Sequence, residues 1–175
     1  MNKHSILLIT YGHFEKNFLE QVAVDVSNEF QCRIDIEESH IELSEFYDST
    51  RRQYDGNKLL EEIDSMFLSP DIKKIGIFRV DLFIPILTFI FGQAILNGNS
   101  GIASLYRLRN EHYGMPQDEE LLISRLKKII IHELGHTFGL LHCHNPTCVM
   151  LSSTYVEDID QKTQKLCTKC KKLVD

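Results

Sequence analysis

Most of the potential metal ligands of this chain lie in one stretch, HELGHTFGLLHCHNPTCVM, which runs from His132 to Met150. The stretch contains four histidines, two cysteines and one glutamate within 19 residues. His132 and His136 are four residues apart, so on a helix both imidazoles leave the same face one turn apart. Both rings can then reach one zinc ion at about 2.0–2.1 Å. Glu133 lies about 100° around that helix from His132, within reach of a water molecule beside the ion.

A third histidine follows a glycine that can reverse the chain. Gly139 accepts a left-handed backbone conformation at little cost, so the turn there can bring His142 to the same ion. Three histidine ligands leave the fourth tetrahedral position of zinc to water, whose pKa the ion lowers toward about 7. Glu133 would take the proton of that water as general base and pass it to the leaving amine. These residues predict metal-assisted hydrolysis of a peptide bond.

Four cysteines form two pairs that suggest a second metal site. Cys143 and Cys148 are separated by four residues, and Cys167 and Cys170 by two. Two such pairs in a cytoplasmic chain favour a structural four-sulfur zinc site, with two disulfides or free core thiols as the alternatives. Because Cys143 follows His142 directly, the two metals would lie within roughly 14 Å of each other.

The histidine stretch resembles a known family of peptidases. HELGHTFGLLH matches the metzincin pattern H-E-x-x-H-x-x-G-x-x-H in full. The continuation CHNPTCVM and the later CTKC narrow the resemblance to the archaemetzincins, over the whole chain. The resemblance implies that His132, His136 and His142 bind the catalytic zinc and that Glu133 is the general base. It also implies that Met150 is the methionine of the Met-turn beneath that zinc.

The resemblance implies a second metal as well. In archaemetzincins the equivalents of Cys143, Cys148, Cys167 and Cys170 bind a structural zinc, which gives two Zn²⁺ ions per chain. The structural zinc would clamp residues 143–175 next to the third histidine. A segment this short cannot bury much core by itself, so the metal would supply part of its stability.

Two other residues could interfere with these sites. His144 could compete as a ligand, but directly after Cys143 it is expected to face solvent. Cys32 could block the catalytic zinc, as a pro-segment cysteine does in some metzincins. It lies in a strand pattern, however, and no separate pro-segment is visible, so we do not expect this role.

The elements that must position the histidines begin with alternating strands and helices. Their β-α-β-α-β order predicts right-handed crossovers and a mainly parallel sheet. We expect strands at residues 5–10, 31–37 and 73–80, helices at 15–30 and 57–67, and a polar loop from about 38 to 56.

The second half of the chain should supply the sheet edge and the active-site helix. Residues 87–96 and 101–108 read as two strands joined by NGNS, so one of them is antiparallel to its neighbour. We expect substrate to pair with residues 88–94 as an added strand. The start signal from Pro116 to Glu120 predicts a long helix that runs to about Thr137. Residues 156–166 should contain a short helix.

Together these expectations define an α/β fold. It has a twisted mixed sheet with an antiparallel edge strand, an active-site helix and a small zinc-clamped C-terminal subdomain. We expect one domain over residues 1–175, with an N-terminal part at 1–142 and a C-terminal part at 143–175.

The amino-acid composition of the chain argues against some classes of function. The chain has 175 residues, of which 43% are hydrophobic and 25% charged, as in soluble globular proteins. Its net charge of -6 argues against broad nucleic-acid binding. Its most apolar stretch, residues 82–96, is shorter than the roughly 18–20 residues that a membrane span needs. Five lysines near the end are expected to form a solvated face, although a nucleic-acid-binding module is an alternative: Lys162, Lys165, Lys169, Lys171 and Lys172.

The residues therefore predict a zinc-dependent metallopeptidase that acts on peptide or protein substrates. We expect a cytoplasmic monomer without nucleic-acid or membrane partners. The alternative is a non-catalytic, zinc-stabilised peptide-binding or scaffold protein. Glu133 argues against it, since zinc binding alone does not require a carboxylate at that position. Whether the enzyme cleaves inside peptides or as an aminopeptidase stays open.

Overall fold

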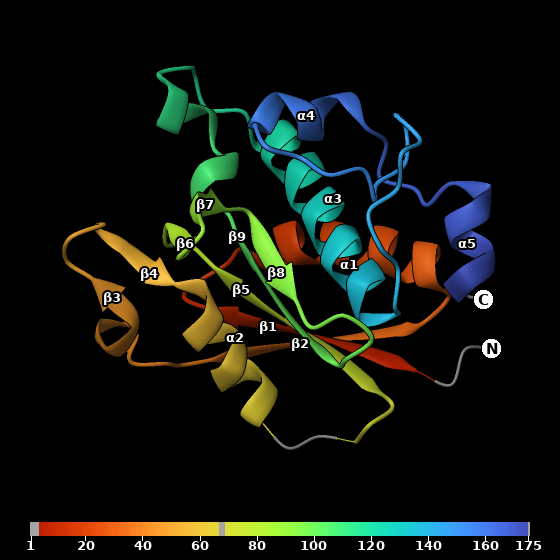
Figure 1. Cartoon of the computed structure of the whole chain (residues 1–175), viewed down its shortest axis with the longest axis horizontal. Helices are drawn as coiled ribbons and strands as arrows, with labels where there is room; N and C mark the ends of the chain where they lie inside the picture. The colour runs from red at the N-terminus through yellow and green to blue at the C-terminus, as the bar shows by residue number, and fades with distance from the viewer. Residues whose placement is uncertain (1–3, 67–68, 175) are drawn as a thin grey trace.

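The computed structural model describes residues 4–66 and 69–174 (Figure 1). The strands are β1 (Ser5–Tyr11), β2 (Arg33–Ser39), β3 (Tyr47–Asp48), β4 (Gln53–Asp55), β5 (Ile72–Phe78), β6 (Leu82–Ile84), β7 (Leu87–Ile90), β8 (Gly92–Ala94) and β9 (Ser100–Ser104). The α-helices are α1 (Lys16–Phe30), α2 (Gly56–Ser65), α3 (Glu119–Thr137), α4 (Val156–Gln161) and α5 (Thr168–Val174). Short 3₁₀ helices occupy Leu43–Phe46, Tyr106–Leu108 and Asn110–Tyr113.

The main sheet has the order β2-β1-β5-β9-β8. β1 pairs in parallel with both β2 and β5, and β5 pairs in parallel with β9. β8 pairs antiparallel with β9 and lies at the edge of the sheet. The structure thus confirms the predicted mixed sheet with an antiparallel edge strand.

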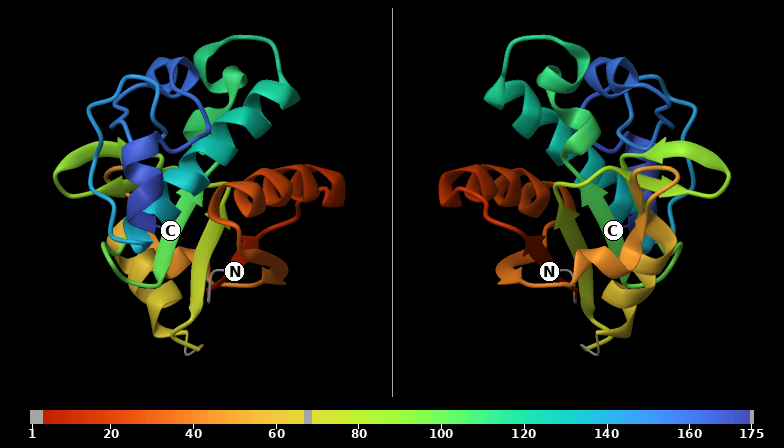
Figure 2. Two further views of the ribbon diagram at one scale, coloured as in Figure 1. Left: turned by 90° about the vertical axis from the view of Figure 1, so that its right-hand side faces the viewer. Right: turned by 90° about the vertical axis from the view of Figure 1, so that its left-hand side faces the viewer.

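Helices cover both faces of this sheet (Figures 1 and 2). Successive side chains of β1 point to opposite faces of the sheet, so alternate residues belong to different helix layers. Ile6 and Leu8 pack in the core that contains α1 and α3, whereas Leu7 and Ile9 pack in the core that contains α2. Each fully buried Leu or Ile contributes about 1.5–3 kcal/mol, so these two cores hold the helices on the sheet.

A second, smaller sheet with the order β3-β4-β6-β7 corrects two expectations. Residues 38–56 are not a plain polar loop, since they contain β3, β4 and a 3₁₀ helix. Residues 87–96 are not one strand either: β7 belongs to the small sheet and β8 to the main sheet. The chain changes sheets at Phe91, whose buried side chain joins the α3 core and whose carbonyl accepts from Ser104 N at 2.9 Å.

Helix α3 forms where the sequence predicts it. Asp118 caps its N-terminus by accepting a hydrogen bond from Leu121 N at 2.9 Å, and two glutamates follow in the first turn. The helix ends at Thr137, as predicted. Lys73 of β5 donates to the carbonyl of Thr137 at 3.1 Å and so ties the end of the helix to the sheet. A cation at a helix C-terminus also interacts favourably with the helix dipole.

The residues after α3 return along it. The predicted helix within 156–166 is α4, which Arg125 of α3 holds through a bidentate ion pair with Asp160 at 2.7–2.8 Å. α5 was not predicted.

The remaining expected elements differ from the structure only at their ends. The expected strand 101–108 ends at Ser104, and a 3₁₀ helix follows it. The expected helix 57–67 corresponds to α2, and its last residue, Phe67, lies outside the described residues. In the part of the chain that the structure describes, no helix is long and apolar enough to span a membrane.

Candidate active site and metal centres

The last turn of α3 and the turn after it bring three histidines together. His132 and His136 project from one face of the helix. Gly139 then adopts φ +89°, the left-handed conformation that glycine accepts without strain, and its N–H donates to His136 O at 2.9 Å. This turn brings His142 back, with its ring centroid 5.2 Å from that of His132 and 5.1 Å from that of His136. The structure confirms the predicted reversal at Gly139.

Hydrogen bonds fix which ring nitrogen His132 and His136 each offer to a metal. His132 Nδ1 lies 2.8 Å from Val149 O, and His136 Nδ1 lies 2.7 Å from Leu140 O. A carbonyl oxygen only accepts, so both Nδ1 atoms carry the hydrogen and both Nε2 atoms present a lone pair. The two Nε2 atoms are 3.1 Å apart.

That separation fits a shared zinc ion. Two nitrogen ligands about 2.0–2.1 Å from a tetrahedral zinc ion lie about 3.3 Å apart. Ring nitrogens of His132, His136 and His142 all lie within 4.8 Å of one another. Burial lowers the pKa of each of the three imidazoles, which favours the neutral form that binds metals. The donor set therefore fits a zinc ion.

Glu133 lies beside these histidines in the cleft. Its side chain is only 5% exposed, and burial raises its pKa to about 8, while the nearby charge of Lys162 acts in the opposite direction. A divalent cation at the histidines would also favour the carboxylate form of Glu133. Glu133 thus lines the same cleft as the three histidines.

Met150 is fully buried and packs against α3. A Cβ added at Gly135 would lie only 2.4 Å from the sulfur of Met150 and would collide with it. Only a glycine allows this contact between the histidine-bearing turns of α3 and the methionine. Met150 thus lies where a Met-turn would support the histidines from below.

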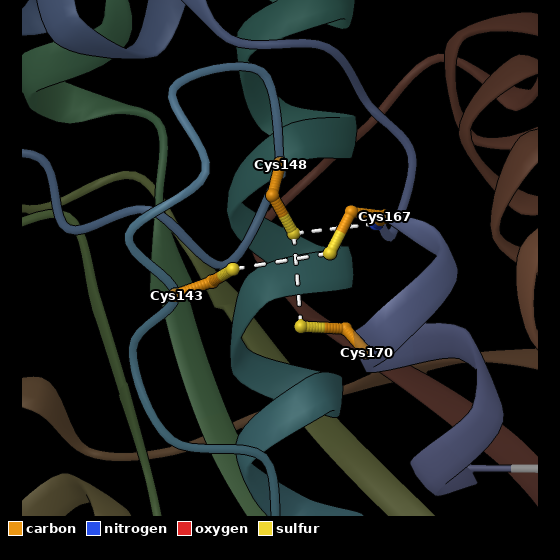
Figure 3. A group of neighbouring side chains, drawn as sticks. All are labelled: Cys143, Cys148, Cys167 and Cys170. Atoms are coloured by element: carbon orange, nitrogen blue, oxygen red, sulfur yellow. Dashed lines mark hydrogen bonds between the residues drawn. The ribbon is translucent and has the colours of Figure 1, made fainter.

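The side chains of Cys143, Cys148, Cys167 and Cys170 converge on one point (Figure 3). The sulfurs of Cys143 and Cys167 are 3.8 Å apart, as are those of Cys148 and Cys170. Four sulfurs about 2.3 Å from a tetrahedral zinc ion lie about 3.8 Å apart, whereas a disulfide bond measures about 2.05 Å. All four sulfurs lie within 4.8 Å of one another, and none forms a disulfide. The cluster fits a four-sulfur metal site.

Backbone amides surround this cluster. The N–H of Asn145 donates to the sulfur of Cys143 at 3.4 Å, and the N–H of Cys167 donates to the sulfur of Cys148 at 3.3 Å. Hydrogen bonding from the backbone of Cys170 lowers the pKa of the Cys167 thiol to about 7, whereas burial raises the pKa of the Cys148 and Cys170 thiols. A bound divalent cation would favour the thiolate, which is the form that binds zinc.

One loop connects the cysteine cluster to the histidines. The N–H of Cys143 donates to Met150 O at 2.9 Å and closes the loop. Val149 lies between Cys148 of the cluster and Met150, and its carbonyl is the one that orients His132. The position of the first histidine therefore depends on a loop that the cysteines hold.

The histidines open into a cleft of about 530 Å³. Residues 87–94 of β7 and β8 form one wall, and residues 152–155 after Met150 form another. The predicted substrate-binding segment, 88–94, is thus part of the cleft wall. His144 is exposed and outside the histidine group, as expected. Cys32 is buried in the core, where its thiol donates to Phe30 O, and it does not line the cleft.

Lys162 is the residue of this site that the sequence analysis misplaced. Instead of lying on a solvated face, its side chain is buried at 2% exposure and lines the cleft. Its Nζ donates to Leu151 O at 2.6 Å, and burial lowers its pKa to about 8. Val156 and Ile159, six and three residues earlier, are buried too. Their spacing of three puts Lys162 in phase with the buried face of α4, a pattern that could have revealed it.

Comparisons with known proteins agree with this geometry. A model of "Peptidase family M54" matches residues 10–175. The chain is 35% identical over 173 residues to an archaemetzincin of Thermococcus kodakarensis, covering 95% of this chain and 93% of that protein.

Two solved structures show the same fold. A zinc-dependent peptidase of Methanocorpusculum labreanum superposes with a TM-score of 0.88 at 29% identity, covering 98% of this chain and 100% of that chain. An archaemetzincin of Methanopyrus kandleri superposes with a TM-score of 0.85 at 30% identity, covering 98% of this chain and 94% of that chain. With the family match spanning nearly the whole chain, this protein belongs to peptidase family M54, the archaemetzincins, and is a zinc-dependent metallopeptidase.

Proposed function

We propose that this metallopeptidase hydrolyses peptide bonds with Glu133 as general base and with zinc held by His132, His136 and His142. The observation that carries the proposal is the pair of Nε2 atoms 3.1 Å apart, each imidazole being oriented by a backbone carbonyl at its Nδ1. When bound, zinc would polarise the scissile carbonyl and make water a stronger nucleophile. Met150 would support the histidines from below.

The residues of the chain supply the remaining steps. Glu133 accepts a proton from the attacking water at its carboxylate and then gives it to the nitrogen of the leaving amine. β8 is an edge strand, so its outer side can pair with an extended peptide, as in strand addition.

We further propose that Cys143, Cys148, Cys167 and Cys170 hold a second, structural zinc ion. This ion would fix the C-terminal part, 143–175, to the rest of a single domain, 1–175. No observation favours the non-catalytic alternative, since the carboxylate is retained beside the histidines. The cytoplasmic location, the monomeric state and the absence of nucleic-acid partners stay predictions.

A peptide-library digestion tests the proposed activity. The zinc-loaded protein is incubated with two libraries, one with free and one with acetylated N-termini, and the products are sequenced by mass spectrometry. We expect cleavage that a chelator abolishes and added zinc restores. Cleavage of the acetylated library identifies an endopeptidase, and cleavage of the free library alone identifies an aminopeptidase. If neither library is cut by protein that contains zinc, the proposal is wrong.

Metal analysis of the same preparation tests the two sites. We expect two zinc ions per chain, with the histidine site losing its ion to chelator first because His142 is exposed. A maximum of one zinc ion per chain would contradict the second site.

A further inference from the structure

We propose that Lys162 binds a carboxylate of the peptide substrate next to the scissile bond, with Ser153 as a second donor. This inference rests on the proposed hydrolysis in the cleft and adds a substrate class to it. The enzyme would then prefer peptides in which either an acidic side chain or a free C-terminus lies beside the cleaved bond.

Lys162 differs from the other buried lysines in how its ammonium group is satisfied. An ammonium group has three donor hydrogens. Lys73 donates to three acceptors, Lys74 to three and Lys128 to two, and none of these lysines lines the cleft. Lys162, although only 2% exposed, has one such bond in the described structure, to Leu151 O. Its ammonium group therefore retains donor capacity at the wall of the active-site cleft.

No carboxylate neutralises Lys162 directly. Among residues 4–66 and 69–174, no Asp or Glu forms an ion pair with its Nζ within 4.0 Å. By contrast, buried Arg125 and Arg107 each have a carboxylate partner, Asp160 and Asp81 respectively. The charge of Glu133 does act on Lys162, but the two groups form no ion pair, so a ligand carboxylate can still contact the ammonium group directly.

A second potential donor lines the same cleft as Lys162. Ser153 follows Leu151, the acceptor of the Lys162 ammonium group, by two residues. Its Oγ is buried and has no partner among the described residues. An ammonium group and a hydroxyl in the same wall are suited to the two oxygens of a carboxylate.

The charge distribution of the cleft favours an anion over a cation. Glu133 is the only acidic residue that lines it in the described structure, and we assign Glu133 to the attacking water. Lys162 and the metal at the histidines would both attract negative charge. Because the whole chain carries a net charge of -6, the cleft would be a local positive site on an acidic protein.

The test compares matched peptides that differ only in charge. One pair carries Glu or Gln next to the cleaved bond, with both peptide ends blocked. A second pair ends beside that bond with a free or an amidated C-terminus. The ratio of kcat/KM within each pair is measured for the wild type, Lys162→Met, Lys162→Arg and the control Lys165→Met, which removes a lysine that is exposed.

We expect the wild type to prefer the charged member of at least one pair by about 10-fold to 100-fold, the usual contribution of a hydrogen bond to a charged group. The pair that shows the preference identifies the carboxylate as side chain or C-terminus. Lys162→Met should lose the preference, and Lys162→Arg and Lys165→Met should keep it. A preference unchanged in Lys162→Met, or absent from the wild type, would overturn the inference.

If Lys162→Met cleaves neither peptide measurably, a binding measurement replaces the kinetic one. The affinity of each peptide is measured by calorimetry for zinc-loaded Glu133→Gln with and without Lys162→Met. We expect the charged peptide to lose about 10-fold or more in affinity and its neutral partner to change little. Equal losses for both peptides would assign Lys162 a purely structural role. Failure of the proposed function shows separately, as cleavage that persists in Glu133→Gln.

Discussion

Replacing Cys170 by serine should remove a large part of the zinc-dependent stability of this protein. Cys170 is 5% exposed, and its sulfur lies 3.8 Å from that of Cys148 at the centre of the cluster. A structural zinc ion binds with about 10–16 kcal/mol in small zinc-binding peptides. Shared over four thiolates, this energy gives about 2.5–4 kcal/mol for each ligand. The Cys170→Ser variant should lose this amount, because binding energy at such a site is folding energy.

Urea unfolding followed by circular dichroism measures the effect. Each protein is unfolded at a fixed free zinc concentration and again with chelator, and the difference is its zinc-dependent stability. With an m-value of about 2 kcal/mol/M, the zinc-dependent shift of the midpoint should be smaller by about 1–2 M in Cys170→Ser than in the wild type.

Cys32→Ser is the matched control. Cys32 is equally buried, at 4% exposure, but does not belong to the group of four cysteines. Its replacement should lower stability with and without zinc alike and leave the zinc-dependent part unchanged. If Cys170→Ser retains the full zinc-dependent shift of the wild type, the cysteine cluster is not a structural zinc site.

Two further substitutions test how the site is supported. Gly135→Ala should destabilise the fold by about 1–3 kcal/mol, as overpacking does, because the new Cβ collides with Met150; a thermal unfolding midpoint equal to that of the wild type would refute the contact. Arg125→Met should cost about 1.5–3 kcal/mol, because Asp160 and the carbonyl of Leu108 lose a charged hydrogen-bond donor. Arg33→Met, which breaks an exposed pair, should cost less than about 1 kcal/mol in the same urea titration, and equal losses for the two arginines would contradict this account.

The elements with strong periodicity could be predicted from the sequence. Strand β1 and helices α1 and α3 follow hydrophobic patterns that the structure uses directly, and α3 begins and ends where the sequence predicts it. The histidine group followed from the same helix, because the spacing of His132 and His136 and the turn at Gly139 need no tertiary information.

Features that depend on tertiary contacts were missed. β3 and β4 have two and three residues, too few to show a hydrophobic period. They are held by pairing, β3 with β4 and β4 with β6. Nothing in the apolar sequence of residues 82–96 indicates that the chain passes from the small sheet to the main sheet at Phe91. α5 has only one buried residue, Cys170, among its described residues, so the cysteine cluster rather than an apolar face positions it. Lys162 was misplaced because lysine is rarely buried, whereas here it lines an active-site cleft.

The central claim is that Glu133 acts as the general base at a three-histidine zinc site. Its most direct test is turnover by Glu133→Gln at matched zinc content, because glutamine keeps the shape of the side chain but cannot accept the proton. We predict that turnover falls by about 10²-fold to 10⁴-fold, the usual contribution of a general base, with little change in peptide affinity. Undiminished cleavage by the zinc-loaded variant, with contaminating proteases excluded, would contradict the account.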